Sequence, residues 1–106
     1  MTRTYSRTRK LYANTVYKLA VGEGDARSRL RSVYRDIRSI GDGDLPVELL
    51  ADHIWIVDQM TKFGGEVGPD GTVYKTALEN TMARIRNSTA RKIAERIVSV
   101  NRTLSS

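Results

Sequence analysis

The sequence predicts an all-α fold: a compact single-domain bundle of four or five helices. Apolar residues recur every three to four positions in each long segment, and none of these segments shows the strict alternation of a half-buried strand. The breaks between them hold Gly at 22–24, 41–43, 64–65 and 68–71, and the only prolines, Pro46 and Pro69. A chain of 106 residues has the length of one domain, 1–106, with one core.

The first helix is expected to end at Gly22, because glycine suits the left-handed position that follows a helix. The segment up to this glycine is rich in Arg, Ser and Thr and has no acid, which is also typical of a mitochondrial presequence. Its apolar face favours a structural helix instead. That face consists of Tyr5, Tyr12, Val16 and Leu19.

The second helix is the most clearly marked in the sequence. Gly24 and Asp25 precede it as capping residues, and Gly41 follows it. At 100° per residue its apolar side chains fall within one arc, with Tyr34 at the edge. The arc contains Ala26, Leu30, Val33, Ile37 and Ile40.

A third helix is expected from Asp44, as its N-cap, with Pro46 tolerated in the first turn. Its apolar arc covers about half of the circumference, which is wider than in the other helices. We therefore expect it to be the central helix, with neighbours on two sides. The arc contains Leu49, Leu50, His53, Ile54, Ile56, Val57, Met60 and Phe63.

The last third of the chain is expected to contain two helices after a turn. Gly64 and Gly65 end the third helix, and the sequence GPDGT at 68–72 is typical of a turn. The helical pattern resumes at Val73. We expect a break near Asn87 or Ser88, both good N-cap residues, and one long helix is the alternative.

Charge is arranged in blocks along the chain. Residues 1–22 carry five bases and no acid, whereas residues 41–71 carry seven acids and one base. Residues 72–106 return to seven bases and two acids, so that the net charge of +6 conceals one acidic segment between basic ones. Such patterning bears on partners and assembly rather than on catalysis.

No residue pattern points to catalysis, a cofactor or a metal. The chain has no cysteine and lacks the P-loop, EF-hand and G-x-S-x-G patterns. The single histidine, His53, lies within an apolar arc, which favours a buried, hydrogen-bonded role over metal binding or acid–base chemistry. No run of 18 apolar residues is present, so we expect no membrane partner. The absence of cysteine is compatible with a reducing compartment, and we expect a cytoplasmic location.

Two candidate binding surfaces emerge from the helical wheels. On the third helix Trp55 falls on the polar side, where it is either an exposed protein-binding anchor or covered by the last helix. On the first two helices arginines and lysines form stripes suited to phosphate, or to a solvated face neutralised by the acidic third helix. The candidate protein-binding residues are Trp55, Glu48, Asp52 and Gln59. The candidate nucleic-acid-binding residues are Arg27, Arg31, Tyr34, Arg35 and Arg38, with Arg3, Arg7 and Lys10 on the first helix.

The sequence thus favours a non-enzymatic protein-binding module or regulatory adaptor, whose partner is another protein or a second copy of itself. The alternative is a sequence-tolerant protein that binds the backbone of DNA or RNA. The first is preferred because the acidic segment lies in the same small bundle and would repel a nucleic acid.

Overall fold

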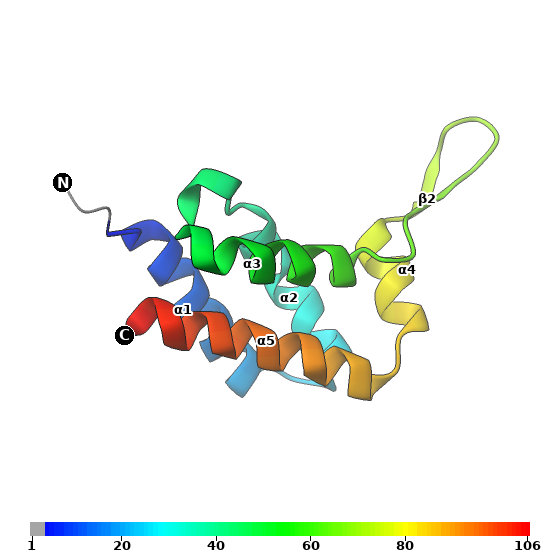
Figure 1. The fold of residues 1–106 in the computed structure, drawn as a ribbon. Helices are drawn as coiled ribbons and strands as arrows, with labels where there is room; N and C mark the ends of the chain where they lie inside the picture. The colour runs from blue at the N-terminus through cyan, green and yellow to red at the C-terminus, as the bar shows by residue number, and fades with distance from the viewer. Residues whose placement is uncertain (1–3) are drawn as a thin grey trace.

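A computed structural model describes residues 4–106 of the chain, and in this range the fold is an all-α bundle (Figure 1). The predicted fold class and the break into five helices are both confirmed. Arg3, a candidate nucleic-acid-binding residue, lies outside the described residues. The elements are α1 (Ser6–Val21), α2 (Ala26–Arg38), the 3-10 turn η1 (Asp42–Asp44), α3 (Val47–Met60), β1 (Glu66–Val67), β2 (Val73–Lys75), α4 (Ala77–Arg84) and α5 (Asn87–Ser105).

Helix α5 packs against α1, α2 and α3, so the longest helix organises the bundle. It runs antiparallel to α1: the Arg9 side chain donates to the carbonyl of Leu104, and Asn87 at the other end of α5 bonds Ala26, just beyond the end of α1. The predicted arc of α2 supplies three fully buried residues. The largest fully buried apolar side chains are Tyr12, Leu30, Ile37, Ile56, Met60, Met82, Ile93 and Ile97.

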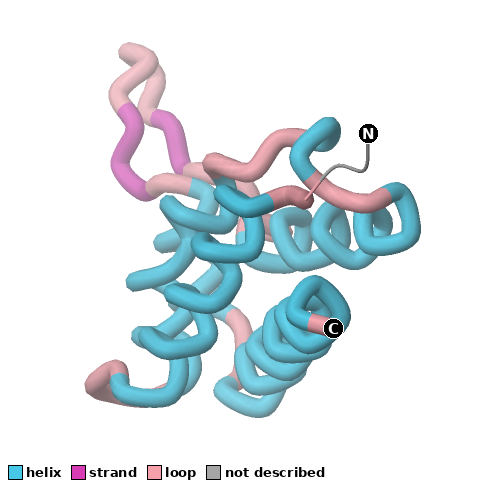
Figure 2. The backbone as a smooth tube through the Cα atoms, turned by 90° about the vertical axis from the view of Figure 1, so that its left-hand side faces the viewer, coloured by secondary structure: helices cyan, strands magenta, loops and turns pink. Residues whose placement is uncertain are grey.

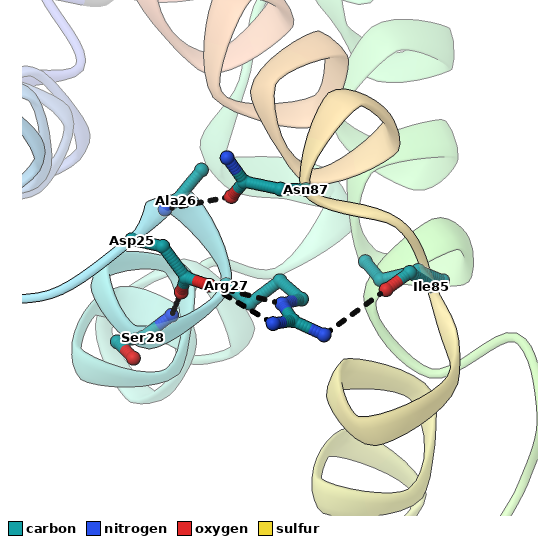
Figure 3. A network of polar contacts seen from close by, with 6 residues as sticks. All are labelled: Asp25, Ala26, Arg27, Ser28, Ile85 and Asn87. Carbon is teal, nitrogen blue, oxygen red and sulfur yellow. Dashed lines mark hydrogen bonds and ion pairs between the residues drawn. The ribbon is translucent and has the colours of Figure 1, made fainter.

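A polar network joins the start of α2 to the connection between α4 and α5 (Figure 3). Asp25 accepts a hydrogen bond from the Ser28 amide at 3.0 Å, which confirms it as the N-cap of α2. Asn87 or Ser88 was expected to cap the last helix, and neither does: the N-cap position of α5 is Arg86, without a side-chain cap hydrogen bond. The Oδ1 of Asn87 accepts instead from the Ala26 amide at 3.0 Å. The side chain that local propensity assigns to the cap of α5 therefore forms a hydrogen bond to another helix instead.

The start of α3 also differs from the prediction. Asp44 does not cap this helix: its carboxylate accepts from the Gly41 amide at 2.9 Å and closes the turn η1. Pro46 occupies the N-cap position of α3 and has no side-chain hydrogen bond to offer. The aspartate is thus satisfied within the preceding turn, two residues too early to cap the helix.

The predicted start of the fourth helix at Val73 was wrong, because an antiparallel hairpin occupies residues 66–75. Figure 2 shows its two strands standing away from the helices. All five strand residues are exposed, including the apolar Val67, Val73 and Tyr74, so the strands do not show the alternation of a buried and a solvent-facing side. Helix α4 begins only at Ala77, where the hydroxyl of Thr76 accepts from the Glu79 amide.

Candidate binding surfaces

Helix α3 exposes a line of apolar side chains on its outer side. Val47 is 83% exposed and Ile54 is 43% exposed, and Ala51 between them is also exposed. The spacings of four and three residues place them along one side of the helix. Asp58 continues this line, and Glu48 lies beside Val47, about 100° around the helix from it. Both carboxylates are exposed and have no hydrogen bond or ion pair to side chains in residues 4–106. We call these five residues the α3 ridge.

Ile54 was expected to lie in the core, and this was wrong. Helix α3 buries Leu49, His53, Ile56 and Met60 on one side. The apolar arc is wider than the area that α2, α4 and α5 cover, so its margin stays in solvent. Phe63, which was also assigned to the arc, is 44% exposed just beyond the end of the helix.

Trp55 is neither a fully exposed anchor nor fully covered by the last helix, the two alternatives that the sequence left open. It is half-buried and packs against the core, and the Arg96 guanidinium from α5 lies 4.3 Å from the centre of its ring. The same arginine forms an ion pair with Asp52 at 2.9 Å. Of the other candidates, Gln59 is half-buried and Glu48 is exposed. Trp55 and Asp52 therefore join α3 to α5, and of the four predicted residues only Glu48 belongs to the α3 ridge.

The predicted arginine stripe on α2 is largely exposed. Arg31, Arg35 and Arg38 are exposed, and none of them has an ion pair or hydrogen bond with a side chain in the described part of the chain. We call these three residues the α2 arginine surface. Asp36, the acid within this helix, pairs with Lys18 of α1 at 3.1 Å and so leaves them unneutralised.

The remaining candidates of the basic stripes have different surroundings. Arg27 pairs with Asp25 at 3.0 Å and reaches the Ile85 carbonyl at 3.5 Å, as Figure 3 shows. Tyr34 is half-buried and packs against the core, so its ring is not free to stack on a base. Arg7 donates to the Ser39 hydroxyl at 3.5 Å, which places it at the C-terminal end of α2 beside Arg38.

Lys10 is exposed and, unlike Arg7, has no hydrogen bond to the end of α2 among the described residues. The α3 acids Glu48, Asp52 and Asp58 do not pair with the α2 arginine surface in the described residues: Asp52 pairs with Arg96 of α5, and the other two have no ion pair there. The alternative interpretation was that the acidic third helix neutralises the arginine stripe. No direct ion pair of this kind joins α2 and α3 in the described residues.

His53 occupies a buried polar site, as predicted. The Tyr12 hydroxyl donates to its Nδ1 at 2.6 Å, and its Nε2 faces the Ile40 carbonyl at 3.3 Å. This arrangement assigns the ring proton to Nε2, because a carbonyl can only accept. Burial lowers the pKa of His53, and burial also raises the pKa of Tyr12. Both groups therefore stay neutral at neutral pH and tie α1 to α3.

Comparisons with protein-family models, curated proteins and solved structures found no match for the chain. Within residues 4–106, no cluster of three or more His, Cys, Asp or Glu side chains is arranged to hold a metal ion. No helix in the same range has the length and apolar character needed to cross a bilayer. The α3 ridge shares only Glu48 with the predicted protein-binding surface. The α2 arginine surface shares Arg31, Arg35 and Arg38 with the predicted nucleic-acid-binding surface.

Proposed function

We propose that this protein is a non-enzymatic, cytoplasmic protein-binding module or adaptor that docks a partner on the α3 ridge. The observation that carries the proposal is the exposure of Val47 and Ile54 on one line of a helix whose other side is buried in the core. Single exposed apolar residues are ordinary on protein surfaces, whereas an aligned set on a helix is a common docking feature.

The charges of the ridge define the chemistry of the partner. Glu48 and Asp58 lie ten positions apart, which corresponds to about 15 Å along the helix. Neither carboxylate is neutralised by a described side chain. A complementary partner therefore presents an apolar strip with one basic residue at the end that meets Asp58 and another beside the end that meets Glu48, since opposite charges at the rim set orientation and exclude wrong partners.

Affinity capture from an extract of the source cells tests this proposal. The wild-type chain is compared with a ridge variant, Val47→Glu with Ile54→Glu, and with the control Tyr17→Glu, which changes an exposed residue of α1. We expect the ridge variant to lose at least about tenfold of the captured partner, as loss of a central anchor predicts, while the control retains it. Equal capture by all three folded proteins would exclude the ridge as the docking site.

A second candidate function is binding to the backbone of a nucleic acid through the α2 arginine surface. Its support is the absence of acidic partners for Arg31, Arg35 and Arg38, together with the position of Arg7 at one end. Guanidinium groups suit phosphate recognition, and the half-buried Tyr34 favours backbone contacts over base stacking.

The salt dependence of binding to mixed-sequence duplex DNA or RNA tests this candidate. Each phosphate contact contributes about −0.9 to the slope of log affinity against log salt for duplex DNA. The variant Arg31→Gln with Arg35→Gln should flatten the slope by up to two contacts, whereas Arg91→Gln with Arg102→Gln removes the same charge from α5 and should not. An absence of binding at about 50 mM salt, where screening is weak, would rule the candidate out.

A further inference from the structure

A groove of about 700 Å³ lies between α1 and α5, on the side of α5 away from α3. Its floor is made of small and medium apolar side chains from both helices, and the segment before α2 closes one end. The floor residues are Val16, Leu19, Ala20, Ala94 and Val98. A groove of this shape between two helices can accept a third helix, provided that the incoming side chains and charges match.

Arginines dominate the charge of the groove. Arg91 and Arg102 on α5 are exposed, have no ion pair among the described residues, and are eleven positions apart, or about 16.5 Å along the helix. Arg29 joins them and donates to the Leu19 carbonyl at 3.1 Å. Asp25 is engaged by Arg27, so Glu95 is the one lining acid without a described partner. The charge therefore favours an acidic occupant.

The α3 ridge has the complementary pattern. Its apolar residues Val47, Ala51 and Ile54 form one line that Asp58 continues, and Glu48 lies beside the start of this line. Along the axis of α3, Glu48 and Asp58 are about 15 Å apart, which is close to the separation of Arg91 and Arg102 along α5. Within one copy the two surfaces cannot meet. Helix α3 is held against the other side of α5 by the ion pair of Asp52 with Arg96, so its outer ridge faces away from the groove.

We propose that the groove between α1 and α5 receives the α3 ridge of a second copy of this chain. This inference rests on the proposed function of the ridge and names the second copy as its partner. The apolar line lies on the floor of the groove, Asp58 meets one of the two arginines at the end of this line, and Glu48 reaches the other arginine from beside its start. Because ridge and groove are different surfaces, two copies either exchange both contacts or leave one of each free for further copies.

A charge-swap experiment on the purified chain tests the contact. The groove variant is Arg91→Glu with Arg102→Glu, and the ridge variant is Glu48→Arg with Asp58→Arg. All four residues are exposed, so both variants should stay folded. Glu48 lies in the first turn of α3 and Arg102 in the last turn of α5, so each variant should show only a small decrease in melting temperature, caused by the helix dipole. Sedimentation velocity at low salt is measured for each protein and for an equimolar mixture.

We expect the wild type to sediment faster as its concentration rises, and to return to the monomer value at about 1 M salt, where charges are screened. Each variant alone should stay monomeric, because like charges then face each other across the contact. The mixture should associate again, because every ridge in it finds a groove of opposite charge. Restoration by mixing is not expected of variants that are merely damaged.

Two results would overturn the inference. One is a wild type that remains monomeric at about 1 mM, a concentration that detects even weak pairs. The other is self-association that persists unchanged in both folded variants, which would place the contact elsewhere. If the wild type is monomeric but the captured partner is still lost in Val47→Glu with Ile54→Glu, the ridge binds another protein and only the second copy is excluded.

Discussion

Replacing Tyr12 by Phe should destabilise the fold through one missing hydroxyl. Tyr12 is fully buried, and its hydroxyl is the donor to Nδ1 of His53, which is itself 3% exposed. Phenylalanine fills nearly the same volume, so the loss of packing is small. The buried imidazole nitrogen is then left without a donor, which costs about 1–3 kcal/mol of the free energy of unfolding.

The same site predicts a dependence of stability on pH. Burial is the main cause of the lowered pKa of His53, whereas the Ile40 carbonyl and Asp42 oppose the shift. Above about pH 6.5 the imidazole is neutral in both the folded and the unfolded chain. As the pH falls below this value, the unfolded chain gains a proton that the folded chain does not, so stability decreases by at most about 1.4 kcal/mol per pH unit until the folded pKa is passed.

Urea denaturation of the wild type, Tyr12→Phe and His53→Gln between about pH 7.5 and 5 measures both the loss of the hydroxyl and the pH dependence. This pH range lies above the pKa values of Asp25 and Asp70, which are lowered by hydrogen bonds from backbone amides. His53→Gln should lose the pH dependence. His53 is the only histidine, so its NMR titration needs no assignment, and Tyr12→Phe should raise its pKa because only the neutral ring accepts the hydroxyl proton. An unchanged denaturation midpoint in Tyr12→Phe, or a wild type with flat stability over this range, would refute the reasoning.

Two further predictions concern the core and the start of α2. Leu30→Ala removes a fully buried side chain and should cost about 2–5 kcal/mol in thermal or urea denaturation, whereas Val47→Ala on the exposed ridge should change stability by less than about 0.5 kcal/mol. Asn87→Ala removes the acceptor of the Ala26 amide and should cost about 0.5–1.5 kcal/mol, while Asn87→Asp keeps an acceptor and should cost less; equal loss in both would assign the effect to something other than this hydrogen bond.

The sequence predicted the helices well because their burial is periodic. Leu30, Val33 and Ile37 all lie on the buried side of α2, and Asp25 caps it as expected. The hairpin escaped prediction because none of its strand residues is buried, so the alternation that marks a strand is absent. The caps at Asp44 and Asn87 failed because each side chain bonds a different backbone amide from the one that propensity suggests.

The candidate surfaces were predicted less completely. A helical wheel places charged residues on the outer side, and Arg31, Arg35 and Arg38 are indeed exposed. It cannot show how far neighbouring helices cover a wide apolar arc, and Ile54 was therefore assigned to the core. The partial covering of Trp55 depends on Arg96, which is 41 positions away in the sequence. Such long-range pairs leave no local signal in a single sequence.

The energetics of the α3 ridge favour weak, reversible docking over a permanent complex. Full burial of a Val or Ile side chain contributes about 1.5–3 kcal/mol, and Ile54 is already more than half covered, so the two anchors supply about 2–4 kcal/mol. Two surface ion pairs add about 0–2 kcal/mol together, and less at high salt. The loss of translational and rotational freedom costs about 4 kcal/mol or more. The ridge therefore sustains docking only where the partner also buries the floor of a groove, and dissociation on a small change in salt or concentration is the expected behaviour.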